Sequence, residues 1–426
     1  MSTCILWFRN NLRLGDNTPV AEAYSHYSTV IPVYIDEDSW HNTRWVEEGK
    51  GDHRLRFLTE SLADLNDALR NNSSELLVLR GVEPIKALLE LAAKTKATAI
   101  YAPKEFAYNE RKVEFSLRER AKDQGITVHL MTERTLYLES DLPFGVNEIP
   151  EVFSRFRGKV EKRSRVQPPI EEPDVSSFDS LDFNLSSDRI QVPNVFQDQR
   201  SAVPFNGGTI AAWRQLDFYL WESKQILEYK QTRNGMVGRN YSSKFSAFLA
   251  LGCISARQIY DELQRFEEEI KSNESTYWLF FELLWREYFQ WIALKHGKNL
   301  FSAHGLQRER PIRQGFNARA FEKWTSGNTG DSLVDANMKE LAATGFMSNR
   351  GRQNVASYLV HDMGIDWRAG AAFFEKHLID YDPASNYGNW LYNAGRGNDP
   401  RPFRKFDTKI QAERYDPKGE FIEMWT

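Results

Sequence analysis

Hydrophobic positions in the first 135 residues follow two alternating patterns. Continuous apolar runs, rich in β-branched and aromatic residues, occupy 4–8, 30–35, 76–79, 98–102 and 126–131. Between them, apolar residues recur at helical spacing, over 55–69 and again over 85–92. Continuous apolar runs are typical of strands buried on both faces of a parallel sheet. Alternating with amphipathic helices, they predict a doubly wound, Rossmann-like α/β domain over residues 1–135.

The pattern changes twice after that domain. Residues 136–206 are rich in Pro, Ser and Asp and lack sustained periodicity, so we expect a connector between domains with loose helical pieces near 153–162. Residues 207–426 show helical periodicity almost throughout, and Ser255 is a good N-cap for one of these helices. The second domain is therefore predicted to be all-α.

Composition narrows the class of protein. The net charge of −4 argues against a protein that coats nucleic acid, although residues 1–199 carry −7 and residues 200–426 carry +3. Cys4 and Cys253 are the only cysteines, and the eight histidines lack metal-site spacing, so neither a disulfide framework nor a metal site is expected. No long uncharged apolar run and no signal-peptide layout occur. We expect an intracellular monomer away from membranes, cytoplasmic or nucleoid-associated if the chain is bacterial.

A polar cluster in an apolar, helical context is the strongest candidate site. In the segment GFMSNRGRQNVASYLV, Asn349, Arg352 and Gln353 fall on one helical face, and Asp380 and Asp382 of LIDYDPASNYGNW can supply compensating carboxylates. Such groups are costly to bury without partners, and a polar heterocycle would use them well. The alternative is a buried Arg/Asp pair that pins two helices, with tryptophans as core filler.

A second candidate lies at the start of a helix. The segment YSSKFS (241–246) offers serine hydroxyls, a lysine and backbone N–H groups, which together suit a pyrophosphate. The alternative is an ordinary helix cap. The first predicted strand is not followed by G-x-G-x-x-G, which argues against a dinucleotide site of the usual Rossmann kind.

The runs TGDSLVDANMKELAATGFMSNRGRQNVASYLV (329–360) and IDYDPASNYGNWLYNAGRGNDPR (379–401) resemble the FAD-binding end of the photolyase/cryptochrome family, most closely its cryptochrome-DASH branch. The segments YSSKFSAFLALGCISAR and ELLWREYF carry the resemblance further along the chain. It implies an FAD in the helical domain, with Arg352 paired to Asp380, Asp382 toward the N3 edge of the ring and Asn386 facing N5. The other cofactor-binding residues that it implies are Tyr229, Ser242, Ser243, Lys244, Phe245, Ser246, Glu282 and Asn349.

The resemblance also implies a route for electrons. Trp390 and Trp367 match the first two tryptophans that deliver electrons to the photoexcited flavin, a task that suits the oxidisable indole. The third should stand where this chain has Gln314. Either a neighbour such as Phe316 or another tryptophan ends the route, or photoreduction is slower. Without the resemblance, core packing would be the better interpretation of each tryptophan.

Further positions match the family's substrate cavity. Glu282 would hydrogen-bond a pyrimidine dimer or give it a proton, Trp285 would stack on it and Asn349 would bond to it, while Gln353 and Tyr392 mark the DASH branch. Because this cavity is more polar and extrusion from a duplex costs a few kcal/mol, we expect a preference for single-stranded DNA. Candidates for phosphate contacts, each of which could equally be an ordinary surface arginine, are Arg233, Arg350, Arg396, Arg401 and Arg404.

A second chromophore is expected between the domains. Asn109-Glu110 matches the family's folate-antenna positions, so methenyltetrahydrofolate is implied, with Glu110 bonded to its ring. The predicted function is blue-light-driven, FAD-dependent repair of cyclobutane pyrimidine dimers, with Glu282, Asn386, Trp390 and Trp367 in catalytic roles. A photoreceptor that reduces its flavin and changes a partner or DNA interaction is the alternative. A third hypothesis is a protein with no cofactor.

Overall fold

The computed structural model describes residues 2–36, 44–175, 186–312, 314–398 and 405–426. Its N-terminal domain is built on a five-stranded parallel sheet in the order β3-β2-β1-β4-β5. The strands are β1 (Thr3–Phe8), β2 (Thr29–Ile35), β3 (Leu77–Leu79), β4 (Ala99–Pro103) and β5 (Thr127–Met131). All strand pairs are parallel. The predicted parallel sheet is confirmed.

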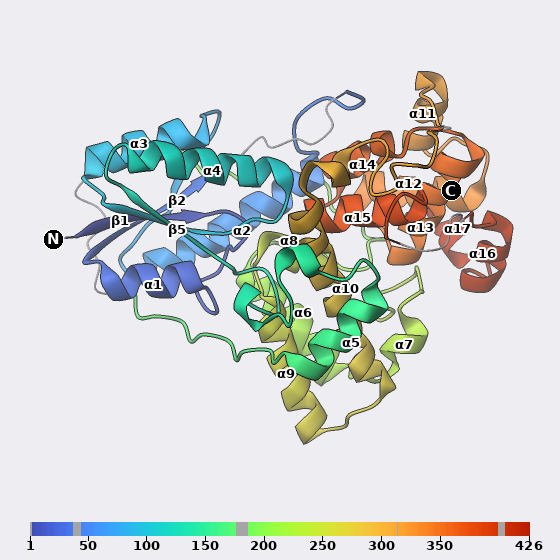
Figure 1. Cartoon of the computed structure of the whole chain (residues 1–426). Coiled ribbons are helices and arrows are strands. Elements are labelled where there is room, and N and C mark those ends of the chain that lie inside the picture. Colours follow the sequence, from blue (N-terminus) through green and yellow to red (C-terminus); the bar gives the residue numbers. More distant parts are fainter. Residues whose placement is uncertain (1, 37–43, 176–185, 313, 399–404) are drawn as a thin grey trace.

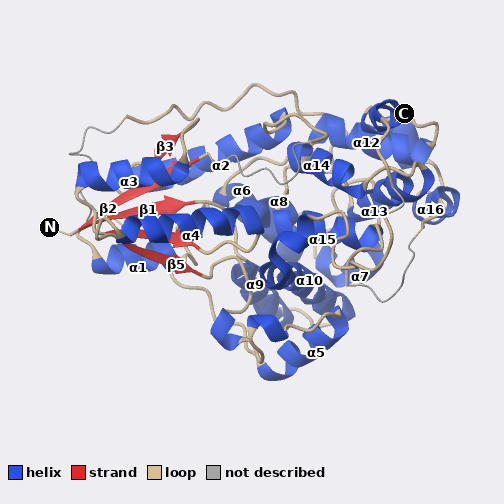
Figure 2. Cartoon of the chain, turned by 45° about the horizontal axis from the view of Figure 1, so that its top comes forward, coloured by secondary structure: helices blue, strands red, loops and turns tan. Residues whose placement is uncertain are grey.

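Helices cover both faces of this sheet (Figure 2). They are α1 (Thr18–His26), α2 (Asp52–Arg70), α3 (Pro84–Thr95) and α4 (Tyr108–Lys122). Alternate residues of β1 divide between two cores: Leu6 packs with the leucines of α2, whereas Ile5 packs with Leu88 of α3 and Leu117 of α4. The strand is therefore buried on both sides, which explains its continuous apolar run.

The connector leaves β5, passes the short helices η1 (Glu139–Asp141) and η2 (Val146–Glu148), and forms α5 (Phe153–Arg163). It later returns to the edge of the sheet, where the Asp188 N–H donates to the Val78 carbonyl oxygen at 2.8 Å. This contact ties the connector to β3.

The remaining chain forms the helical domain, which lies beside the carboxyl ends of the strands (Figure 1). Its elements are α6 (Thr209–Asp217), η3 (Phe218–Glu222), η4 (Gln225–Glu228), α7 (Tyr229–Thr232), α8 (Ser246–Leu251), α9 (Ala256–Glu269), α10 (Glu274–His296), η5 (Gly297–Phe301), α11 (Ala318–Thr325), α12 (Ser332–Thr344), α13 (Asn349–Ser357), η6 (Tyr358–Asp362), α14 (Trp367–His377), α15 (Pro383–Asn393), α16 (Thr408–Tyr415) and α17 (Glu420–Trp425). Ser255 caps α9 as predicted, accepting from the Gln258 N–H at 2.9 Å. Within the described residues, no helix combines the length and apolar character needed to cross a bilayer.

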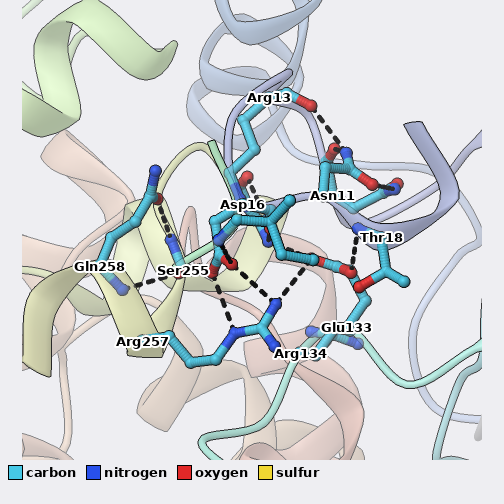
Figure 3. A network of polar contacts seen from close by, with 12 residues as sticks. Asn11, Arg13, Asp16, Thr18, Glu133, Arg134, Ser255, Arg257 and Gln258 are labelled. Atoms are coloured by element: carbon cyan, nitrogen blue, oxygen red, sulfur yellow. Dashed lines mark hydrogen bonds and ion pairs between the residues drawn. The ribbon is translucent and has the colours of Figure 1, made fainter. Parts of the chain in front are cut away.

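A buried ionic network joins the two domains (Figure 3). Asp16, in the loop after β1, accepts from the Ser255 hydroxyl and forms an ion pair with Arg257 at 2.7 Å. Arg13 pairs with Glu133, whose pKa burial raises to about 7. Two cations and two carboxylates thus compensate one another where α9 meets the sheet, because unpaired charges there would be costly.

Candidate flavin site

A cavity of about 260 Å³ opens among the helices of the C-terminal domain. Its walls come from the 241–246 segment and from α7, α10, α13 and α15, elements far apart in the sequence. The cavity brings together most of the predicted cofactor and substrate residues: Tyr229, Ser242, Ser243, Lys244, Phe245, Ser246, Glu282, Asn349, Arg352, Gln353, Asp380, Asp382, Asn386 and Trp390. It also includes Arg233.

The 241–246 segment presents serines and a helix start to the cavity. α8 begins at Ser246, and no described side chain caps its first N–H groups. Lys244, in contrast, is buried in a left-handed conformation, and its ammonium donates to the carbonyl oxygens of Arg239 at 2.9 Å and Ser242 at 3.2 Å. Burial lowers the Lys244 pKa well below its usual value. In this structure, Lys244 therefore braces the loop, while Ser242 and Ser243 face the cavity.

The expected ion pair between Arg352 and Asp380 is present. The guanidinium of Arg352 lies 2.8 Å from the Asp380 carboxylate, and its Nε donates to the Met347 carbonyl oxygen at 2.9 Å. Asp380 Oδ1 is buried and accepts no hydrogen bond from the described residues. Glu340 lies behind this pair, and burial raises its pKa to about 8 against the influence of Arg352 and Lys244.

Asp382 does not serve as the second carboxylate for Arg352. Its carboxylate pairs with Arg134 at 2.6 Å and accepts from Gln290 at 2.9 Å, and it caps α15 through the Ser385 N–H at 2.7 Å. Burial alone would raise the Asp382 pKa, but Arg134 and Arg286 lower it to about 2. Asp382 is thus a fixed anion held from both domains: by Arg134, which follows β5, and by Gln290 and the Ser385 N–H of the helical domain.

Asn386 is oriented by its neighbour in α14. Its amide Nδ2 donates to the Ala371 carbonyl oxygen at 3.0 Å. Asn386 is buried and lies in the cavity wall. This bond leaves the amide oxygen and a second N–H for a ligand.

Glu282 has a partner that the sequence did not suggest. Its carboxylate pairs with Arg233 at 2.7 Å and accepts from the Trp278 indole N–H at 3.2 Å. Burial raises the Glu282 pKa above its usual value, and Arg233 and Trp278 oppose that shift. Arg233, predicted as a phosphate contact, therefore serves first as the counter-ion of Glu282.

Trp285 and Tyr392 line a second, mostly apolar cavity of about 260 Å³. The Trp285 ring stacks on Phe153 of α5, with centroids 3.7 Å apart, and lies 6.2 Å from Tyr392. They line this cavity and not the one lined by Glu282 and Gln353, and their predicted role in binding a lesion stays a prediction. Phe153 belongs to α5, so the connector supplies the ring on which Trp285 stacks.

The predicted arginines divide into different environments. Arg350 donates to Gln353 at 2.8 Å and to Asn234 at 2.9 Å. Arg396 is buried, and its guanidinium donates to the Arg310 carbonyl oxygen at 2.7 Å, so its prediction as a surface phosphate contact is wrong. Arg401 and Arg404 lie outside the described residues.

The aromatic surroundings of Trp390 include a tryptophan that the sequence did not single out. Its ring centroid lies 6.2 Å from Trp324 and 5.1 Å from Phe374. Trp367 is likewise buried, and its indole N–H donates to the Ala303 carbonyl oxygen at 3.3 Å. Trp324 stands ten residues after Gln314, and only the folded structure brings it to Trp390.

The predicted antenna residue lies at the junction of the domains. Glu110, in the first turn of α4, lines a cleft of about 80 Å³ together with Arg9, Lys50, Arg54 and Tyr381. Three cations therefore surround this cleft.

Over the described ranges, no group of three or more His, Cys, Asp or Glu side chains is arranged to hold a metal ion.

An α/β domain beside a helical domain with a polar cavity, lined in part by Trp390, is the arrangement of a photolyase-type flavoprotein. Residues 278–426 match the FAD-binding domain of DNA photolyase, and residues 4–174 match DNA photolyase. The chain belongs to the photolyase/cryptochrome family, in its cryptochrome-DASH branch.

Individual relatives are similar to this chain over nearly its whole length. A cryptochrome DASH of Gloeobacter violaceus is 43% identical over 429 residues, which cover 99% of this chain and 85% of the relative. The crystal structure of a Synechocystis sp. cryptochrome matches with a TM-score of 0.95 and 42% identity, covering 100% of this chain and 88% of that one. An archaeal photolyase from Sulfolobus tokodaii, whose structure contains two FAD molecules, matches with a TM-score of 0.81 and 29% identity over 100% and 90% of the two chains.

The cavity residues fit an FAD. The buried Asp380 Oδ1 can accept a hydrogen bond from a ligand. Arg352 and Asn386 can donate hydrogen bonds to that ligand, and the serines at the start of α8 can bind phosphate groups. A ligand with N–H groups and a pyrophosphate satisfies all three.

Proposed function

We propose that this chain is an FAD-dependent lyase that uses blue light to split cyclobutane pyrimidine dimers, chiefly in single-stranded DNA. The observation that carries the proposal is the single cavity in which Ser242, the Arg352–Asp380 pair, Asn386, Trp390 and Glu282 converge. Any one of these residues, taken alone, could belong to an ordinary structural core. Their convergence on one solvent-accessible space favours a cofactor site.

The residues divide the work of holding the cofactor. Ser242, Ser243 and the N–H groups at the start of α8 bind the phosphates, while Arg352, locked by Asp380, donates to the ring system. Asn386 would face the ring with an amide that both donates and accepts. When bound in its reduced form, the flavin supplies the electron that opens the cyclobutane ring under blue light and recovers it afterwards.

Glu282 acts on the substrate side. Because burial raises its pKa, a larger fraction is uncharged than for an exposed glutamate, and the uncharged carboxyl donates a hydrogen bond to the dimer. Asn349 and Gln353 line the same cavity and add amide contacts to the pyrimidine edges. Trp285 stands in the neighbouring cavity, where one face of its ring is stacked on Phe153.

The preference for single strands follows from the cost of extrusion. Taking a dimer out of a duplex costs a few kcal/mol of unstacking free energy, whereas the same step in a single strand costs little. Here the stacking partner Trp285 is already engaged, so the cavity offers less binding energy to offset that cost. Arg350, beside Gln353, is a candidate contact for a strand phosphate.

Absorption spectroscopy and repair assays test the proposal directly. The purified protein should show flavin absorption and should repair thymine dimers under blue light, faster in single-stranded than in duplex oligonucleotides. Equal and efficient repair of both forms would refute the preference, and a colourless protein would refute the flavin site.

A matched pair of variants tests the binding residues. Arg352→Gln should lose bound flavin, because it leaves Asp380 as an unpaired buried charge. Arg368→Gln removes an arginine of similar exposure from its pair with Asp366, outside the cavity, and should retain the flavin. Equal flavin content in the two variants would contradict the assignment.

The cleft around Glu110 is proposed as the antenna site for methenyltetrahydrofolate. Glu110 would bond to the ring, and Arg54 would attract an anionic tail, while Arg9 and Lys50 are already paired with Glu114 and Asp36. Mass spectrometry of small molecules extracted from the purified protein tests this. Recovery of a different chromophore, or of none, would overturn the assignment.

A signalling role is the second candidate function. The contact of Trp390 with Trp324 favours it, because aromatic neighbours that reduce a flavin under light serve a photoreceptor as well as a repair enzyme. Repair-null Glu282→Ala protein that still supports a light-dependent phenotype in cells would favour signalling.

A further inference from the structure

The segment that contains Gln314 lies at the start of α14. The Asp366 N–H donates to the Gly315 carbonyl oxygen at 2.7 Å, and the Gly315 N–H donates to Gly364 at 3.0 Å. Trp367, the first residue of α14, directly follows this contact. Residues 314–316 are thus held beside one of the two predicted relay tryptophans, yet they offer no indole.

An indole from the other domain lies at this place. Trp45 precedes α2, and its ring centroid lies 6.3 Å from that of Phe316. The guanidinium of Arg368, the residue after Trp367, lies 4.9 Å from the centre of the same ring. Trp45 is partly exposed, whereas Trp390, Trp367 and Trp324 are each at most 2% exposed.

A continuous series of aromatic contacts joins Trp390 to Trp45. Successive ring centroids are 6.2 Å apart from Trp390 to Trp324 and 5.9 Å from Trp324 to Phe321. They are 5.5 Å apart from Phe321 to Phe316 and 6.3 Å from Phe316 to Trp45. The series leads from the wall of the cavity to a ring that solvent reaches.

The charges around Trp45 permit a positive charge on the indole. Arg368 alone would oppose it, but its guanidinium is paired with the Asp366 carboxylate at 2.7 Å and 3.1 Å. The pair is close to neutral overall. Arg44, 5.6 Å from the ring centre, is exposed and therefore screened by water.

We propose that Trp45 is the solvent-side end of a second electron route, which leaves Trp390 through Trp324 and does not use Trp367, whose own route lacks its last indole at Gln314. This inference rests on the proposed flavin site. Trp390 gives one electron to the light-excited flavin and regains it from Trp324, and Trp45 in turn refills Trp324 across the two phenylalanine rings. The oxidised Trp45 releases its indole proton to water. A thiol in solution then returns one electron and one proton, and becomes a thiyl radical.

Photoreduction of the purified flavoprotein with dithiothreitol as donor tests the route. Trp45→Phe should lose the long-lived tryptophan radical in transient absorption, and its photoreduction should slow markedly, while Trp45→Tyr, with an oxidisable phenol, should keep a long-lived radical of tyrosyl character. The matched control is Trp221→Phe, since Trp221 is also partly exposed and lies 4.5 Å from an arginine, Arg265. It should behave as the parent protein. An unchanged radical yield in Trp45→Phe overturns the proposal.

Two further measurements separate this proposal from the flavin site itself. Flavin content should be equal in the parent, Trp45→Phe and Trp221→Phe proteins, so that radical yields compare like with like. Trp390→Phe should abolish photoreduction. If it does not, the proposed relay at the flavin fails; if it does while Trp45→Phe reduces normally, the assignment of Trp45 alone fails.

Discussion

Replacing Asp382 with asparagine removes one negative charge from the floor of the flavin cavity and turns one carboxylate oxygen into an N–H donor. Asparagine has the same shape and is an equally good helix N-cap, so the Ser385 N–H keeps its acceptor. What disappears is the ion pair with Arg134, at 2.6 Å, together with one of the two oxygens that accept from Gln290. The variant therefore tests an electrostatic contact between the N-terminal domain and the start of α15.

The size of the effect follows from the Asp382 pKa. Its folded pKa is about 2, against an ordinary value of 3.8. At ~1.4 kcal/mol per pH unit, this difference is worth about 2 kcal/mol of unfolding free energy at pH 7. A lowered folded pKa stabilises above the unfolded pKa, so the contribution should persist to about pH 5 and be about half lost by pH 3.

Urea unfolding followed by tryptophan fluorescence measures this effect, because nine of the 12 tryptophans lie after residue 200. Asp382→Asn should lower the unfolding free energy by about 2 kcal/mol at pH 7, and the difference should shrink at pH 3 to 4. Asp366→Asn is the matched control, an N-cap aspartate paired with a partly exposed arginine, and should cost at most about 1 kcal/mol. A loss no larger than that of the control, or one independent of pH, would refute the reasoning.

Three further changes test other parts of the site. Gly370→Ala should destabilise the protein by about 1–3 kcal/mol and disturb photoreduction, because its Cβ would lie 2.2 Å from Trp390, whereas Gly158→Ala meets nothing within 4 Å and should do neither. Arg233→Met should raise the Glu282 pKa further and shift the pH profile of repair to higher pH; an unshifted profile would remove Arg233 as the counter-ion that matters. Phe153→Ala should free Trp285 from its stack, at a cost of about 3–5 kcal/mol, and change dimer affinity without changing flavin content.

The sequence predicted the strands and helices more completely than it predicted which side chains form ion pairs. The strands were readable because β1 and its neighbours are buried on both faces, and the Arg352–Asp380 pair because both motifs are long and specific. The partners of Asp382 and Glu282 were not readable, since Arg134 and Arg233 are separated from them by 248 and 49 positions. A signal for Arg134 did exist, because it follows β5, and polar residues after parallel strands commonly face a site.

The N-terminal α/β domain contributes contacts to the cavity of the helical domain. Arg134 is bonded to Glu105 of its own domain and to Asp382 at 2.6 Å each, so the flavin-side carboxylate is oriented by a residue that the sheet positions. Trp45 meets Phe316 from the same side. Arg134, Glu105 and Asp382 are buried, and their attraction is less screened in the protein interior than it would be in water. A substitution of Arg134, which does not line the cavity, should therefore change the absorption spectrum of the bound flavin. A helical domain that held the flavin without the N-terminal domain would not show this effect.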